Sequence, residues 1–161
     1  MDAWIFSPVR PYLRLSVALV TGGSRGIGIA VALALAEAGP AIAVSYRERG
    51  AETGVVADAI PKSDGRAAAF GADVSLRITV QSTVHDIEDR LGPVGILVNN
   101  ADMAAIRSLD DITEEDFDHT IAVNLKSAFL CTQGVLAGMR MRHWGRIVNI
   151  SSVGAHWPPF G

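Results

Sequence analysis

The chain has 161 residues, 49% of them hydrophobic, and a mean hydropathy of +0.28, which fits one globular domain with a substantial core. Its formal net charge of −3 argues against a basic surface, so we expect no nucleic-acid partner. The single cysteine, Cys131, excludes an internal disulfide and a cysteine cluster, and the four scattered histidines have no metal-ligand spacing, so we expect no bound metal.

No apolar run has the length of a membrane-spanning helix, and the first residues lack the pattern of a secretory signal. We therefore expect a cytoplasmic protein with no membrane partner. Residues 1–14 are interpreted as an N-terminal extension, and residues 15–161 as the folded domain.

Apolar stretches predict strands at residues 16–22, 41–46, 67–70, 95–101 and 146–151. Helices are predicted between them, at residues 26–38, 51–60, 76–91 and 113–143. Gly-Pro pairs at 39–40 and 92–93, and Pro61, end the first three helices. Thr113 and Asp116 resemble a capping box for the last helix, whose apolar residues recur at helical spacing: Phe117, Ile121, Leu125, Ala128 and Cys131.

Strands that alternate with helices predict an α/β fold in which a parallel sheet has helices on both faces. The expected architecture is a doubly wound, Rossmann-like sheet with the strand order 3-2-1-4-5.

The segment TGGSRGIG, residues 21–28, lies between the first predicted strand and helix, where a phosphate-binding turn belongs. Gly22 and Gly26 are expected to let the backbone approach a pyrophosphate, and Gly28 to allow close packing of the helix on the sheet. The helix N-terminus supplies free N–H groups and a partial positive charge. The alternative is a plain glycine-rich turn.

Five segments occur in the order and spacing of the short-chain dehydrogenase/reductases: TGGSRGIG, GADVS, NNA, VNLKSAF and GRIVNISS. The chain is identified as similar to this family over about residues 15–161, and most resembles the branch with 3-oxoacyl-[acyl-carrier-protein] reductases and sugar or alcohol dehydrogenases. The resemblance implies an oxidoreductase that binds NAD(P)(H) and a small carbonyl or alcohol substrate, with homo-oligomers possible.

The resemblance also implies roles for single residues. The pyrophosphate would be held by the first segment, at Thr21, Gly22, Ser24, Arg25, Gly26, Ile27 and Gly28. The adenine would be contacted by Asp73 and Val74, and the rest of the cofactor by Asn99, Asn100 and Ala101. Asn124 would support a proton relay, and Ser152 would hydrogen-bond the substrate carbonyl. The alternatives are a helix amide bonded to backbone for Asn124 and a turn residue for Ser152.

Cofactor preference is argued from the end of the second strand, where an NAD enzyme usually has a carboxylate. Here the residues are Ser45, Tyr46 and Arg47, and no acid appears before Glu48. Arg47, with Arg25 in the glycine turn, can pair with a 2′-phosphate. We therefore expect NADP(H) to be favoured over NAD(H), the alternative being that both arginines are only solvated.

Two departures from the family pattern affect function. Asp102 stands where the family has glycine, so it is expected to repel phosphate, to strain a glycine-like backbone, or to be harmlessly exposed. The Tyr-x-x-x-Lys pair of the family is absent: the tyrosines are Tyr12 and Tyr46, and the lysines are Lys62 and Lys126. His156 is not favoured as a substitute acid, because a loop histidine without a fixed partner is poorly positioned.

We therefore expect an incomplete domain that lacks the C-terminal strands and helices. Its fifth strand would be an open edge, its long helix would expose an apolar stripe, and its reductase activity would be low or absent. A non-catalytic nucleotide-binding fragment or interaction module is the alternative function.

Overall fold

The computed structural model describes residues 13, 15–47, 66–104 and 107–152. The expected helix at 51–60, nearly all of the N-terminal extension and His156 lie outside the described residues.

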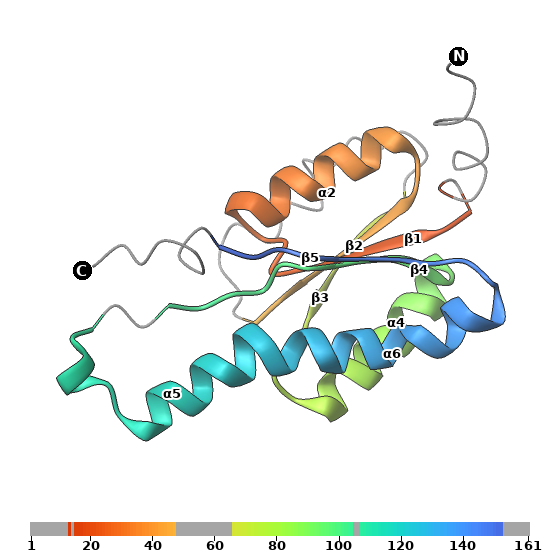
Figure 1. Cartoon of the computed structure of the whole chain (residues 1–161). Coiled ribbons are helices and arrows are strands. Elements are labelled where there is room, and N and C mark those ends of the chain that lie inside the picture. The colour runs from red at the N-terminus through yellow and green to blue at the C-terminus, as the bar shows by residue number, and fades with distance from the viewer. Residues whose placement is uncertain (1–12, 14, 48–65, 105–106, 153–161) are drawn as a thin grey trace, which may run out of the picture.

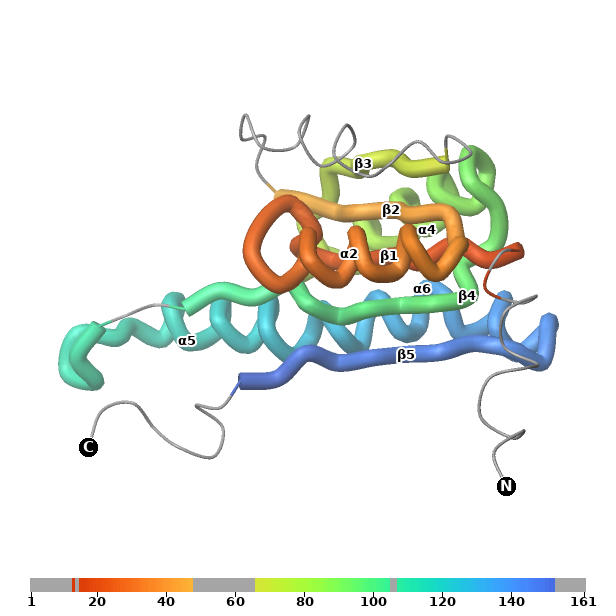
Figure 2. Tube along the Cα trace, turned by 90° about the horizontal axis from the view of Figure 1, so that it is seen from above, coloured from red at the N-terminus to blue at the C-terminus, as the bar shows by residue number. Residues whose placement is uncertain are grey.

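Five parallel strands form one sheet: β1 (Val17–Thr21), β2 (Ala41–Tyr46), β3 (Ala67–Gly71), β4 (Val94–Asn99) and β5 (Arg146–Asn149). Their order is β3-β2-β1-β4-β5, which confirms the predicted topology (Figure 2). The central strands are mostly apolar because helices cover both faces of a parallel sheet, and their buried polar residues lie near their carboxyl ends: Thr21, Ser45 and Asn99. Every residue of β1 and β4 is buried, whereas every residue of the edge strand β5 is exposed.

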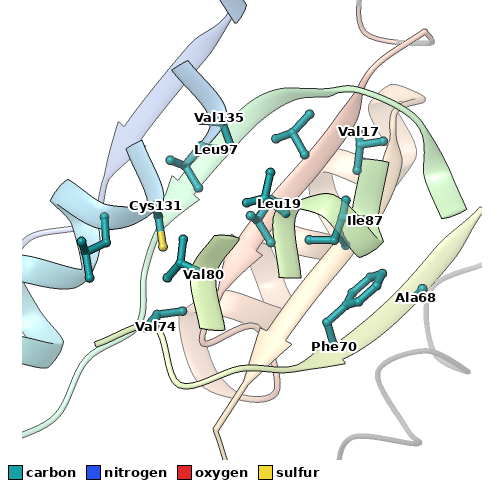
Figure 3. Close-up of a cluster of buried hydrophobic side chains, with 14 of the residues drawn as sticks. Val17, Leu19, Ala68, Phe70, Val74, Val80, Ile87, Leu97, Cys131 and Val135 are labelled. Atoms are coloured by element: carbon teal, nitrogen blue, oxygen red, sulfur yellow. The ribbon is translucent and has the colours of Figure 1, made fainter. Parts of the chain in front are cut away.

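One helix, α2 (Gly26–Ala38), covers one face of the sheet, and α4 (Arg77–Leu91) and α6 (Ser127–Met141) cover the other (Figure 1). Residues of β1 alternate between two cores, as the period of a strand requires. Val17 and Leu19 join α4 and α6 in the larger core (Figure 3), and Ala18 and Val20 face α2.

The predicted ends of α2 are confirmed. Gly39 takes a left-handed conformation with φ of 110°, and its N–H bonds the carbonyls of Leu35 and Ala36. Pro40 then starts the connection to β2. This is the capping arrangement in which glycine tolerates a backbone conformation that other residues avoid.

The longest helix is continuous but not uniform. It begins with α5 (Glu114–Ile121), passes through a π-helical segment, η2 (Ala122–Lys126), and continues as α6. A short 3₁₀ helix, η1 (Leu109–Asp111), precedes it. The predicted capping box is confirmed, with Thr113 and Asp116 bonded to each other's backbone.

This helix exposes several large apolar side chains, as predicted. Phe117, Ile121 and Leu125 are exposed, with 58% of Phe117 and 65% of Leu125 accessible. By length and composition alone, the stretch Glu114–Met141 would suffice to cross a membrane, a test that core helices of soluble proteins also pass. In this fold α6 packs on β4 and α4, as a helix of the layer below the sheet (Figure 1).

Candidate cofactor-binding site

Because the strands are parallel, the segments that follow them meet at one edge of the sheet. The glycine turn follows β1, Arg47 follows β2, Asp73 follows β3, Ala101 follows β4 and Ser152 follows β5. Ligands of doubly wound proteins bind at this edge, where the strand order reverses between β1 and β4. The fold therefore gathers the predicted residues on the side of the sheet where a dinucleotide belongs.

The N-terminus of α2 can accept an anion. Its cap residue, Arg25, is extended and makes no side-chain hydrogen bond to the helix, so no side chain caps the first N–H groups. Gly26 has φ of +55°, and a Cβ added there would meet nothing within 4 Å. An uncapped helix N-terminus beside open space fits a phosphate group, and the exposed side chain of Ile27 borders it.

The other glycines of the turn are required for packing. A Cβ on Gly22, whose φ is +63°, would lie 2.9 Å from the Cα of Ala101, and one on Gly28 would overlap the carbonyl oxygen of Gly22. Gly22 was expected to leave room for a pyrophosphate, but its free side is filled by the segment after β4. Gly28 was expected to let the helix pack on the sheet, but its nearest neighbours are the turn, at Gly22 and Gly23, and the side chain of Asn100.

Asn100 holds the turn against the sheet. Its side-chain amide donates to the carbonyl oxygens of Thr21, at 3.0 Å, and Gly22, at 3.1 Å. Both amide hydrogens are therefore directed to the turn, so Asn100 contributes to the cofactor site by shaping it. The neighbouring Asn99 donates to the Asn149 side chain at 2.8 Å and so links β4 to β5.

Asp73 lies in a tight turn with Ser75. One of its carboxylate oxygens accepts the Ser75 N–H at 3.0 Å and the Ser75 hydroxyl at 2.6 Å. Burial acts to raise the pKa of Asp73, but the bonds from the Ser75 side chain and backbone, with the charges of Arg47 and His119, outweigh it and lower the pKa below 3.8. The neighbouring Val74 is buried in the larger core, so its backbone is the part that can face an adenine.

Arg47 reaches across the edge of the sheet to α5. Its Nη1 lies 3.0 Å from Nε2 of His119, a residue that belongs to no recognised motif. A guanidinium can only donate, so the histidine nitrogen accepts. Sequence reasoning missed His119 because nothing in its helical position relates it to a residue 72 places earlier.

Asn124 lies in the π-helical segment and is exposed. It therefore does not lie on a core face. Its side-chain oxygen accepts the Met103 N–H at 2.9 Å, and its amide donates to the Met103 carbonyl at 2.8 Å. The backbone-bonded alternative therefore describes this structure, and Asn124 fixes the loop after β4 to the long helix. π-Helical turns often occur at functional sites.

Asp102 is exposed and its φ is not positive, so the expected backbone strain is not found. Ser152 is exposed at the end of the segment after β5, and Arg25 is exposed beside the turn. Within the described ranges, no group of three His, Cys, Asp or Glu side chains is placed to hold a metal ion.

This fold and edge are those of the doubly wound α/β proteins, a class that includes the dinucleotide-binding proteins. The family model for short chain dehydrogenases matches residues 16–161, and the chain belongs to that family.

Two relatives named as reductases are identical to this chain at more than a third of the aligned positions. An acetoacetyl-CoA reductase of Paracoccus denitrificans is 39% identical over 144 residues, covering 85% of this chain and 54% of its own length. A 3-oxoacyl-[acyl-carrier-protein] reductase of Synechocystis is 38% identical over 141 residues, covering 88% and 57%.

Among solved structures, a mutant short-chain dehydrogenase/reductase of Serratia marcescens matches with a TM-score of 0.81 and 35% identity, covering 92% of this chain and 60% of that one. The chain spans about half the length of the curated relatives it matches.

Proposed function

We propose that this chain is the cofactor-binding part of an NADP(H)-dependent oxidoreductase that acts on a small carbonyl or alcohol substrate. The observation that carries the proposal is the uncapped N-terminus of α2, where Gly26 borders open space at the edge of the sheet. This is the place and the chemistry of a pyrophosphate site.

A bound nicotinamide dinucleotide supplies hydride transfer. The chain's own residues then have separate tasks in the proposal. The N–H groups at the start of α2 bind the pyrophosphate, and the Asn100 side chain holds the glycine turn in its conformation. The Ser152 hydroxyl donates a hydrogen bond to the substrate oxygen. Asn124 keeps the segment after β4 in place through both Met103 contacts.

The preference for NADP(H) is supported by charge. Arg47 stands directly after β2, where an NAD-binding protein usually has a carboxylate, and Arg25 lies in the turn. A guanidinium pairs well with a phosphate monoester. The names of both reported reductases specify acetoacetyl or 3-oxoacyl thioesters, so acetoacetyl-CoA is the first substrate to test. A cytoplasmic location and pairing of copies belong to the same proposal.

The alternative is a nucleotide-binding protein without catalysis. It describes these 161 residues taken alone, in which no tyrosine has a lysine four residues later. In the family that pair provides the proton and orients the nicotinamide ribose. A positioned general acid contributes about 10²–10⁴-fold to rate, so this chain by itself should be a very poor reductase.

Two measurements test the proposal. Calorimetric titration should show tighter binding of NADP⁺ than NAD⁺, and the difference should shrink in Arg47→Ala. Arg140→Ala is the matched control, because it removes the same charge near the far end of α6. Equal affinities for the two cofactors would contradict the preference, and absence of binding would contradict the site.

Turnover distinguishes the two functions. The 161-residue chain should not oxidise NADPH with acetoacetyl-CoA. A fusion that adds the corresponding later segment of a related reductase, with its Tyr-x-x-x-Lys, should do so if the lineage is catalytic. An ordinary enzymatic rate from the unfused chain would show that another group delivers the proton.

A further inference from the structure

Three charged or titratable side chains meet beyond the carboxyl ends of β2 and β3. Arg47 follows β2 and Asp73 follows β3. His119 belongs to α5, which comes later in the chain, after β4, and which the fold brings to this edge. Arg47 and His119 touch at 3.0 Å, and positive charge on either side chain lowers the pKa of Asp73. The cluster lies where a doubly wound fold presents the ribose of a bound dinucleotide.

The contact between Arg47 and His119 orients both side chains. The guanidinium has no acceptor, so Nε2 of His119 must carry its lone pair toward Arg47 and the ring proton must reside on Nδ1. A protonated ring has donors at both nitrogens and cannot accept from Arg47. The observed contact therefore belongs to neutral His119, which keeps an exposed arginine in one direction.

The charges around His119 come from each element packed near it. Arg47 after β2 is positive and Asp73 after β3 is negative, while Asp116 on α5 itself is paired with Arg107 at 3.0 Å. The Asp73 carboxylate accepts hydrogen bonds from Ser75, and its negative charge partly cancels the positive charge of Arg47. A phosphate monoester that arrives here with about two negative charges therefore needs a second cation.

We propose that His119 is a specificity-determining residue that positions Arg47 when neutral and, on binding of a ribose 2′-phosphate, takes up a proton and becomes a second hydrogen-bond donor to it. The inference rests on the proposed preference for NADP(H), and adds to it a dependence on pH that arginine alone cannot give. Histidine is the side chain whose charge ordinarily changes between about pH 5 and 8.

Adenosine 2′,5′-bisphosphate and adenosine 5′-monophosphate test this directly, because they differ only in the 2′-phosphate and need no nicotinamide site. Calorimetry on the whole chain gives the ratio of their affinities from about pH 8 to about pH 6. When the binding enthalpy is measured in two buffers of different ionisation enthalpy, the titrations also give the number of protons taken up on binding. The ratio should rise about tenfold as the pH falls, the size of one charge-assisted hydrogen bond.

His119→Gln is the main variant, because glutamine can still accept from Arg47 but cannot gain a proton. It should keep the preference at high pH, lose most of the rise on acidification and take up fewer protons. His119→Phe should also lower the preference at high pH, because the contact between the Arg47 guanidinium and Nε2 of residue 119 is lost. His85→Gln is the matched control, since His85 is an exposed histidine on α4 paired with Asp89.

The 2′-phosphate itself titrates near about pH 6, so the difference between the wild type and His119→Gln is the decisive quantity. Identical pH profiles and proton uptake in the two proteins would overturn the role of His119 while leaving the NADP(H) preference intact. Equal affinity for the two nucleotides in the wild type at every pH would overturn both. Circular dichroism confirms that each variant retains its helices.

Discussion

The hydroxyl of Thr21 accepts two backbone hydrogen bonds from the segment after β4, from the N–H of Asn100 and of Ala101, each at 3.0 Å. It also donates to the Val98 carbonyl at 3.4 Å. One buried side chain at the end of β1 thus ties together the two strands at which the sheet reverses its order, and fixes the spacing of the cofactor edge.

Thr21→Val should therefore destabilise the fold although it conserves shape. Two partly buried N–H groups lose their acceptor, which costs about 1–3 kcal/mol in the free energy of unfolding. Urea denaturation of the wild type and the variant measures this difference in the free energy of unfolding. Thr120→Val is the control, because the Thr120 hydroxyl bonds only the Asp116 carbonyl of its own helix. Equal small effects for the two would mean that Thr21 does not stabilise the junction.

Gly26→Asn separates the binding role of this glycine from its backbone role. Asparagine tolerates the left-handed conformation better than other residues, so stability should change little. Its side chain would enter the open space at the start of α2, so NADP⁺ binding should be lost. Gly26→Val should lose binding and also about 1–2 kcal/mol of stability, because a branched residue is strained at this φ of +55°.

Ala34→Val, on the exposed side of the same helix, is the control for both Gly26 variants and should bind normally. Full affinity in folded Gly26→Asn would place the phosphate elsewhere. Gly22→Val should lower stability more than Gly26→Val does, because the valine side chain at position 22 collides with Ala101 and disrupts the turn itself.

Cys131 should not react in the native protein. Burial raises the pKa of its thiol to about 12, and only 2% of the residue is accessible. Alkylation by iodoacetamide needs the thiolate, so labelling should be negligible in buffer and complete in urea. Mass spectrometry after a timed pulse measures it, and rapid native labelling would mean that α6 separates readily from the sheet.

The start of α5 should lose stability in acid. Hydrogen bonds from the Thr113 backbone and side chain, aided by Arg107 and His119 and opposed by burial, lower the pKa of Asp116 below its ordinary 3.8. A carboxyl whose pKa falls on folding stabilises the fold above its unfolded pKa, and this contribution disappears as the pH drops through the lower, folded value. Stability conferred by Asp116 should thus be lost below about pH 4.

Asp116→Asn provides the comparison, because asparagine keeps an acceptor but does not titrate. The difference in free energy of unfolding between wild type and variant should be constant from about pH 7 to 5 and should shrink below about pH 4. A difference that is independent of pH would show that ionised Asp116 is not what stabilises this helix end.

The sequence predicted the elements well where local chemistry decides them. The bounds of α2 and β2 were predicted to the residue, and Gly39 and Pro40 mark the break between the two segments. The strand order followed from alternation alone. β5 was predicted both as a strand and as an open edge, and it lies at the edge of the sheet with Ile147 and Val148 exposed.

The site was predicted in outline, and its contacts were not. Motifs placed the right segments at one edge because each motif follows a strand. They could not show that Gly22 packs on Ala101 and that Asn100 is occupied by the turn, since these are contacts between segments about 80 residues apart. His119 lay outside every motif, and only the path of α5 brings it to Arg47.

The π-helical turn at Ala122–Lys126 affects how relatives should be aligned with this chain. A π turn carries one residue more than the α turn it replaces, which rotates the helix beyond it by about 100°. A relative that lacks the turn would therefore be one residue shorter between Thr113 and Met139. The gap belongs inside the helix, beside Asn124, although gaps are usually assigned to loops. Placed in the preceding loop, it would pair every residue of α5 with the wrong counterpart.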